Sequence, residues 1–156
     1  MRDIVDGILI FDSGALMTLT EAQLRRYVDE RYVERGREYA KRGLIVLNNV
    51  TDTQAKAGCF GSRVYAVELN LKNNRLSGVC SCPAFEDFGP CKHIAATAFA
   101  VMSAEAGTYH PHPNAIERTE EHQQIRNRLL DLEKSELVDL LMNSLDDEEL
   151  NYWLDQ

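Results

Sequence analysis

Residues that interrupt or cross-link a chain are scarce in this sequence of 156 residues, which has nine glycines, four prolines, four cysteines and one tryptophan. So little glycine and proline excludes a collagen-like or low-complexity chain, and a hydrophobic share of 44% is enough to build a core. Long apolar runs are also missing. The most apolar stretch, Ile94 to Met102, is far shorter than the roughly 20 residues that cross a bilayer. We therefore expect one globular domain with or without an appendage, and no membrane partner.

Two further absences concern targeting and catalysis. A secretory signal has a basic start and a long apolar core, whereas here Asp3 and Asp6 precede a four-residue apolar run. We therefore expect a cytoplasmic protein. No phosphate loop, no Gly-x-Ser-x-Gly and no His-Glu-x2-His motif is present in the sequence. We accordingly predict that the chain is not an enzyme and takes no small-molecule substrate.

The formal net charge of −8 is distributed unevenly along the chain. Residues 20–93 hold 12 Lys or Arg against 9 Asp or Glu, whereas residues 114–156 hold 4 against 12. The acidity therefore belongs to the C-terminal part, and the chain divides into two electrostatic pieces near residue 110. We predict a domain over residues 1–106 with its core at 44–103, a linker at 107–115 and an acidic helical segment at 116–156.

The N-terminal two-thirds of the sequence has the pattern of an α+β fold. A capping box at Thr18 and Glu21 predicts one helix that runs to Arg42 and ends at Gly43. An antiparallel β-meander follows, and then a helix that is rich in alanine. The strands are expected at 44–50, 54–59, 63–71 and 75–82, with the Tyr65 face buried, and the helix is expected at 92–106.

Beyond the stiff linker, the pattern predicts helices at 116–133 and 135–145, the second capped by Ser135, and the start of a third at 146–154. Leucines at helical spacing give these helices an apolar stripe, which fits either packing on the core or an interface. Trp153 and Leu154 have little sequence after them to pack against. We interpret this ending as a sign that the chain is a fragment of something longer.

Three of the four cysteines lie within twelve residues and are followed by a histidine, in the pattern Cys80-x-Cys82-x8-Cys91-x-His93. Such a Cys3His set is typical of closed, tetrahedral structural zinc sites. Cys80 and Cys82 point to one face if they close a strand, because side chains two apart share a face there. Residues two apart on a helix diverge by about 200°, so a helix must begin between Cys91 and His93. Between the ligand pairs, Pro83 and residues 85–90 are expected to form a knuckle, with Phe85 and Phe88 as its hydrophobic plug.

Other uses of these residues explain less of the pattern. A disulfide is disfavoured in a cytoplasmic chain, and a nucleophilic dyad of Cys91 and His93 leaves Cys80 and Cys82 unexplained. Four protein ligands leave no open position for a catalytic zinc, so we predict one structural Zn²⁺. We do not count Cys59 as a ligand, since a lone cysteine in a strand is usually a small buried hydrophobe. The remaining histidines, at 110, 112 and 122, are not assigned to a metal.

The segments that carry a family resemblance are a turn, a strand and the two ligand pairs: Gly61-Ser62, Tyr65-x-Val67-x-Leu69, Cys80-Ser-Cys82-Pro83 and Pro90-Cys91-Lys92-His93-Ile94-Ala95-Ala96. They resemble the SWIM-type zinc finger over about residues 44–103. The segment from Arg35-Gly36 to Ala40 also looks like the one that precedes this finger in bacterial members. The resemblance implies a ββα-like zinc module that binds DNA or protein, with the Cys3His set as its ligands. It suggests a bacterial SWIM protein, with the N-terminal part of a helicase-like ATPase as one expected setting.

Two functions follow from these observations. The first is a zinc-binding accessory module that contacts nucleic acid, DNA or RNA, within a larger DNA-processing assembly. Its phosphate contacts are expected from Arg35, Arg37, Arg63, Lys72, Arg75 and Lys92. The competing interpretation of these residues is a solvated basic face. The alternative function is a protein-interaction module that docks a helicase-like ATPase or another partner through the acidic helices, without touching nucleic acid.

Overall fold

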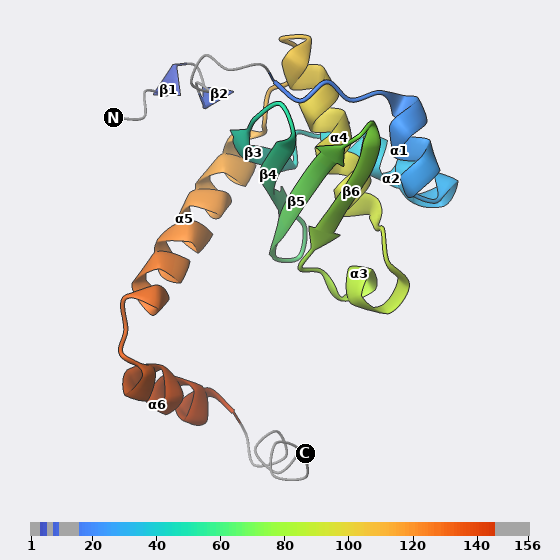
Figure 1. Ribbon diagram of the computed structural model, residues 1–156. Helices are drawn as coiled ribbons and strands as arrows, with labels where there is room; N and C mark the ends of the chain where they lie inside the picture. Colours follow the sequence, from blue (N-terminus) through green and yellow to red (C-terminus); the bar gives the residue numbers. More distant parts are fainter. Residues whose placement is uncertain (1–3, 6–7, 10–15, 146–156) are drawn as a thin grey trace. The chain divides into compact units, whose positions relative to one another are not determined.

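The computed structural model describes residues 4–5, 8–9 and 16–145 of the chain (Figure 1). The chain forms two compact units, Met1–Glu120 and Glu121–Gln156. The first unit opens with two short antiparallel strands, β1 (Ile4–Val5) and β2 (Ile8–Leu9). The helix predicted at 146–154, together with Trp153 and Leu154, lies outside the described residues. No helix of the described residues has the length and apolar character that a membrane span requires.

The single helix predicted from Thr18 to Arg42 is wrong, because the structure has two helices there, α1 (Glu21–Tyr27) and α2 (Glu30–Lys41). The capping box is formed by Thr20 and Gln23, two residues later than predicted. Val28 and Asp29 separate the two helices. Val28 has an extended backbone conformation and a buried side chain, and the carboxylate of Asp29 accepts a hydrogen bond from the Arg31 N–H. A second strong N-cap therefore starts α2, and the chain changes direction between the helices.

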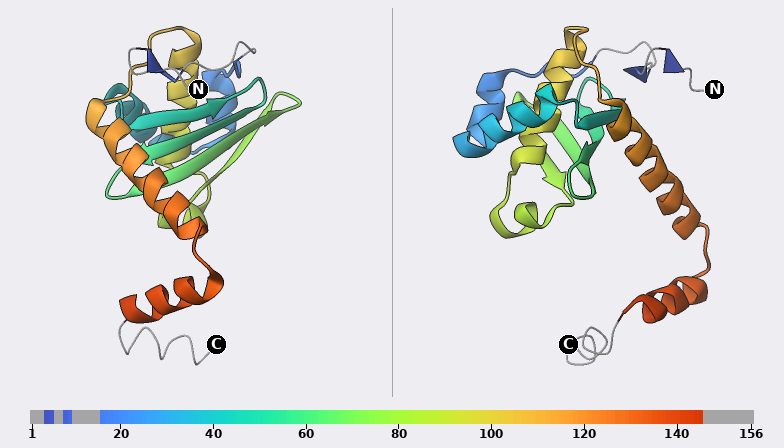
Figure 2. Two further views of the ribbon diagram at one scale, coloured as in Figure 1. Left: turned by 90° about the vertical axis from the view of Figure 1, so that its left-hand side faces the viewer. Right: turned by 180° about the vertical axis from the view of Figure 1, so that it is seen from behind.

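The predicted β-meander is confirmed. Strands β3 (Ile45–Val50), β4 (Gln54–Phe60), β5 (Val64–Lys72) and β6 (Arg75–Cys80) form one antiparallel sheet in the order β3-β4-β5-β6 (Figure 2). Val67 and Leu69 are buried on the inner face, as the period of two predicts, and Tyr65 lies partly buried on the same face. Asn73 and Asn74 join β5 to β6 with φ angles of 50° and 62°, which is the two-residue turn that favours Asn and Gly.

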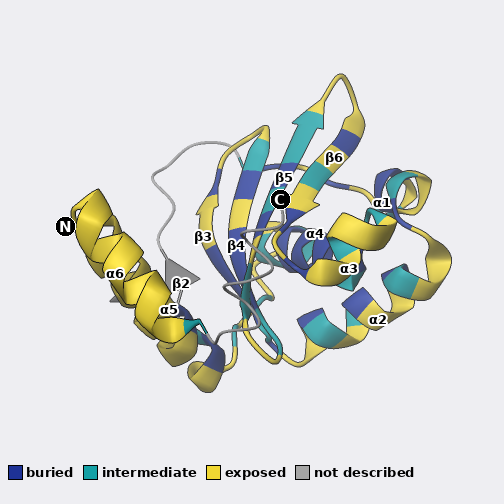
Figure 3. Cartoon of the chain, turned by 90° about the horizontal axis from the view of Figure 1, so that it is seen from below, coloured by how far each residue is buried: buried dark blue, intermediate teal, exposed yellow. Residues whose placement is uncertain are grey.

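The predicted alanine-rich helix is also present, as α4 (Lys92–Glu105), and it lies between the inner face of the sheet and α2 (Figure 3). The crossing of α2 over α4 is close because position 36 is glycine. A Cβ atom at Gly36 would lie 2.5 Å from Ala95 Cβ and 2.7 Å from Ala96 N. Gly36 therefore sets how near the two helices approach, and its cost to helix propensity is offset by this packing.

At each edge of the sheet, a tyrosine hydroxyl forms hydrogen bonds with the backbone of the edge strand. On β6, the Tyr27 hydroxyl donates to the Gly78 carbonyl at 2.9 Å and accepts from the Gly78 N–H at 3.1 Å. On β3, the Tyr109 hydroxyl donates to the Ile45 carbonyl at 2.8 Å and accepts from the Ile45 N–H at 3.2 Å. Each hydroxyl thus satisfies a backbone pair that an edge strand would otherwise leave to solvent.

The C-terminal helices are α5 (Pro113–Leu130) and α6 (Lys134–Ser144). The first turns of α5 cross the outer face of the sheet, where Thr119 lies against Gly58 (Figure 2). The N-cap of α6 is Glu133, in a capping box with Glu136, so the predicted cap at Ser135 is wrong by two residues. Within the second unit, large apolar side chains are exposed along both helices: Ile125, Leu129, Leu130, Leu137, Val138, Leu140, Leu141 and Met142.

Candidate metal centre

The four predicted ligands lie at the ends of three successive elements. Cys80 is the last residue of β6, and Cys82 is the N-cap of α3 (Pro83–Phe88). Cys91 is the N-cap of α4, and His93 lies in the first turn of that helix. The helix therefore begins between Cys91 and His93, as the spacing predicts, because only extended backbone at Cys91 lets both side chains face one point.

The atoms that could bind a metal are close enough to share one ion. The three sulfurs and the imidazole nitrogen all lie within 4.8 Å of one another. Cys82 Sγ is 3.6 Å from Cys91 Sγ, and His93 Nδ1 is 3.7 Å from Cys80 Sγ and 3.8 Å from Cys91 Sγ. Zinc–ligand bonds of about 2.3 Å to sulfur and about 2.0–2.1 Å to nitrogen give tetrahedral edges of about 3.8 Å for S–S and about 3.6 Å for S–N. The cluster therefore fits a single structural zinc ion.

The cluster is enclosed by the protein. Its residues are 7%, 3%, 2% and 5% exposed, in the order Cys80, Cys82, Cys91 and His93. The pKa of Cys91 is lowered to about 3, chiefly by hydrogen bonding with the Cys80 thiol and also by the His93 ring and the backbone N–H groups of Ile94 and His93, while burial opposes the shift. The same interaction raises the pKa of Cys80, while burial raises the pKa of Cys82. One thiolate is thus favoured at the start of α4, where the positive end of the helix dipole suits an anion.

Two tyrosines hold the imidazole of His93 in place. The Tyr65 ring stacks on it with centroids 4.8 Å apart and planes inclined by 26°, and the Tyr39 ring meets it edge-on at 5.7 Å. Lys92 Nζ donates to the Tyr39 hydroxyl at 2.8 Å, which places a cation beside the site. The predicted burial of the Tyr65 face does not include this contact with the histidine, which depends on the register of the sheet: Val67, two residues after Tyr65 on the same face, pairs with Cys80.

The segment between the ligand pairs differs from the prediction. It forms the short helix α3, which Pro83 starts and Gly89 ends with φ of 79°. Phe85 packs against the core as expected, but Phe88 is 71% exposed, so the predicted plug of two phenylalanines is wrong. Phe88 is the last residue of α3 and lies in solvent, because little of the described chain covers this end of the short helix.

The other cysteine and the other histidines do not join the site. Among the described residues, the Cys3His cluster is the only group of three or more His, Cys, Asp or Glu side chains that lie close enough together to hold an ion. Cys59 is fully buried in β4, and burial raises the pKa of its thiol. His110, His112 and His122 are exposed, and His112 Nδ1 accepts a hydrogen bond from the Asn114 N–H.

The structure does not gather the six predicted phosphate-binding residues into one patch. Arg37 binds Glu21 at 2.7 Å and stacks over Phe99, and Lys92 is bound to Tyr39. The others are exposed at separate places: Arg35 on α2, Arg63 before β5, and Lys72 and Arg75 at the far end of the β5–β6 hairpin. The nine-residue β5 separates Arg63 from Lys72 by about 30 Å.

The Cys3His cluster joins the end of an antiparallel hairpin to the first turn of a helix. This arrangement places the first unit among the structural zinc fingers. Residues 65–102 match the family model described as SWIM zinc finger, so this part of the chain is a SWIM zinc finger. The matched residues run from Tyr65, which stacks on the histidine ligand, to Met102 in α4, and include all four metal ligands. No curated protein and no solved structure gives a significant match to the chain. The predicted link to a helicase-like ATPase has no support in these findings.

Proposed function

We propose that this chain is a zinc-stabilised accessory module that contacts nucleic acid through its N-terminal unit. The four-ligand site supports a structural role for the ion, because it offers no open position to a substrate. When bound, zinc cross-links β6 to α4 and thereby fixes the hairpin against the helix. The division into residues 1–106, 107–115 and 116–156, the cytoplasmic location and the absence of catalysis are part of the same proposal.

The proposal rests on the ion pairs of residues 20–93, which engage most of the acidic residues there but leave most of the basic residues without an acidic partner. Six of the nine acidic residues there have a basic partner within 4.0 Å: Glu21, Asp29, Glu30, Glu34, Glu38 and Glu68. Seven of the twelve basic residues have no such partner among the described residues: Arg26, Arg35, Arg42, Arg63, Lys72, Arg75 and Lys92. Unpaired cations on a folded surface supply the electrostatic attraction that draws in a polyanion.

The direct test is fluorescence anisotropy of the zinc-loaded full chain with labelled single-stranded and duplex DNA and with RNA of the same sequence, repeated over a salt series. We expect binding at low salt that weakens steeply as salt is added, because each phosphate contact releases a counterion. A protein with intact zinc content that binds none of the three at low salt would refute nucleic-acid contact.

A second function, docking of a protein partner, is favoured by the exposed apolar side chains of the second unit. Ile125 and Leu130 on α5 are 60% and 65% exposed, and Leu140 and Leu141 on α6 are each 52% exposed. Exposed aliphatic side chains gathered on neighbouring turns are typical of interaction surfaces. The acidic residues between them predict a partner whose apolar surface is bordered by basic residues.

This second function is tested by quantitative affinity purification of the wild-type chain and of Leu140→Asp/Leu141→Asp. The matched control is Asp139→Asn, a change on an exposed position of the same helix that leaves the apolar side chains in place. Docking predicts a protein that co-purifies stoichiometrically with the wild type and with the control but is lost from the double variant. Identical recovery from all three would exclude the helices as the docking surface.

A further inference from the structure

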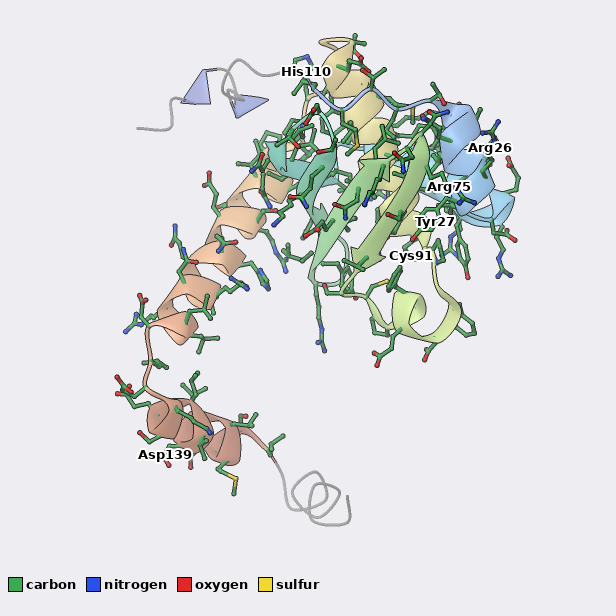
Figure 4. All side chains as sticks on the ribbon, viewed as in Figure 1. Arg26, Tyr27, Arg75, Cys91, His110 and Asp139 are labelled. Carbon is green, nitrogen blue, oxygen red and sulfur yellow. The ribbon has the colours of Figure 1, made fainter. Side chains whose placement is uncertain are left out.

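A cleft of about 370 Å³ lies between α1 and the β5–β6 hairpin. Three residues of α1 and three residues at the start of β6 and its turn form the lining: Gln23, Arg26, Tyr27, Asn74, Arg75 and Leu76. Figure 4 labels Arg26 and Arg75 on these neighbouring elements. None of the four metal ligands lines the cleft, so it is a second feature of the first unit.

The walls of the cleft are held by side-chain bridges between α1 and the hairpin. Gln23 is 8% exposed; its Oε1 accepts hydrogen bonds from the Thr20 N–H and hydroxyl, and its Nε2 donates to Asn74 Oδ1. Tyr27 binds the backbone of Gly78 through its hydroxyl in both directions. The two elements are therefore fixed at both ends of their contact, and the cleft is preorganised.

The charged side chains that line the cleft are both cationic. Arg26 and Arg75 contribute guanidinium groups, no carboxylate is among the lining residues, and neither arginine has an acidic partner within 4.0 Å among the described residues. The Nδ2 group of Asn74 donates to no side chain or backbone atom of that part of the chain. Lys72 stands directly opposite Arg75 across the hairpin and adds a further positive charge.

The neighbouring acids are already engaged elsewhere. Glu21, on the same helix, accepts from Arg25 and from Arg37, and Glu30 and Glu34 pair with Arg25. Two guanidinium groups on the walls of one cleft repel each other unless an anion lies between them. Arginine forks match the oxygens of a phosphate, and side-chain amides complete such a site with neutral donors.

We propose that this cleft is a phosphate-binding site that receives one backbone phosphate of a nucleic-acid strand, with Arg26 and Arg75 as its principal contacts. That the phosphate belongs to a nucleic acid rests on the proposed function, whereas the binding of a phosphate group as such rests on the residues of the cleft. Leu76 and the partly buried Tyr27 also line the cleft, so the adjoining sugar has apolar side chains to pack on. Contact through phosphate and sugar predicts binding with little base preference.

The test compares two double variants that remove the same charge. Arg26→Gln/Arg75→Gln changes the cleft, and Arg42→Gln/Arg63→Gln changes two exposed, unpaired arginines outside it. Both zinc-loaded proteins are first checked for unchanged circular dichroism and zinc content. Labelled single-stranded DNA is then titrated over a salt series. We expect the cleft variant to bind at least about tenfold more weakly with a salt slope lower by about 1, and the control to lose less than about threefold.

A second arm uses inorganic phosphate and follows the side-chain Nε–H signals of Arg26 and Arg75 by NMR. We expect both signals to shift in the wild type. If DNA binds equally well to both double variants and phosphate moves neither signal, the cleft is not a phosphate site. If phosphate shifts both signals but the wild type binds no DNA or RNA, the proposed function fails while the cleft stands as a site for a free phosphate ester. Equal losses in the two double variants would mean diffuse attraction and would also overturn the cleft proposal.

Discussion

The ring of Tyr65 on β5 stacks on the imidazole of His93 on α4, with centroids 4.8 Å apart. This contact joins the sheet to the metal-binding histidine without a hydrogen bond. Groups that orient a ligand typically change metal affinity by about 10- to 100-fold when they are removed. The stacked ring thus belongs to the metal site although it contributes no ligand atom.

Replacing Tyr65 by alanine is therefore expected to weaken zinc binding by about tenfold or more, because His93 loses its stacked support. Tyr65→Phe is the matched control, since it keeps the ring and removes the hydroxyl that lies 3.0 Å from Ser62 Oγ. Competition with a chromophoric chelator measures both affinities. Equal zinc affinity in the two variants would show that stacking does not orient the ligand.

The ligand set could be predicted from sequence because its chemistry is local. Cys80, Cys82, Cys91 and His93 lie within fourteen residues, and the dihedral preferences of a strand end and a helix start are enough to place them. The exposure of Phe88 could not be predicted in this way, because burial depends on which neighbours reach the far end of α3. The pattern of apolar residues gave no information on that.

The start of the N-terminal helix was mispredicted because two overlapping segments satisfy the same rule. Thr18 and Glu21 match a capping box, and so do Thr20 and Gln23. Thr18 instead donates to Glu105, while Gln23 also reaches Asn74. The capping box that forms, Thr20 with Gln23, is thus the one that is compatible with these contacts to distant parts of the chain. The cleft is unpredictable for the same reason, since folding alone brings Arg26 and Arg75 together.

The crossing of α2 and α4 predicts a strong dependence on Gly36. Gly36→Ala places a Cβ atom 2.5 Å from Ala95 Cβ, and overpacking of this kind lowers the free energy of unfolding by about 1–3 kcal/mol. The loss is expected although alanine favours a helix over glycine by about 1 kcal/mol. The control is Gly61→Ala, where the nearest atom is at 3.5 Å. Urea titration of both variants measures the difference, and an unchanged or raised stability in Gly36→Ala would contradict the close crossing.

The edge of β6 offers a prediction about a single hydroxyl. Tyr27→Phe removes both hydrogen bonds to the Gly78 backbone, which is expected to lower the free energy of unfolding by about 1–2 kcal/mol. Amide hydrogen exchange at Gly78 should become faster, while exchange at Ile45 on the opposite edge stays as in the wild type. Tyr109→Phe should show the reverse pattern. Exchange that changes equally at both edges in either variant would argue against separate roles.

Glu21 makes a contribution to stability that depends on pH. Hydrogen bonds from Arg37 and then Arg25 hold the pKa of the Glu21 carboxyl below its usual range. Because the unfolded chain then takes up the proton more readily, the contribution is complete above the ordinary carboxyl pKa of about 4.3 and is lost as the pH falls below it. Glu21→Gln should therefore lower stability at neutral pH and lessen its decline under acid. Glu117→Gln, at an exposed position of α5, should leave the whole profile unchanged; a Glu21→Gln profile parallel to the wild type would contradict the ion pair.

We conclude that one zinc ion, held by Cys80, Cys82, Cys91 and His93, fixes the hairpin to α4. Native mass spectrometry gives the zinc content of the wild type, Cys91→Ala and Cys59→Ala, and NMR follows each protein as a strong chelator is added. We predict one zinc per chain in the wild type and in Cys59→Ala, and none in Cys91→Ala. Removal of zinc should unfold residues 44–103, because a structural zinc contributes about 10–16 kcal/mol, as much as a small domain's whole stability. A wild-type chain that binds no zinc, or that keeps its spectrum after the zinc is removed, would rule out a structural zinc at this site.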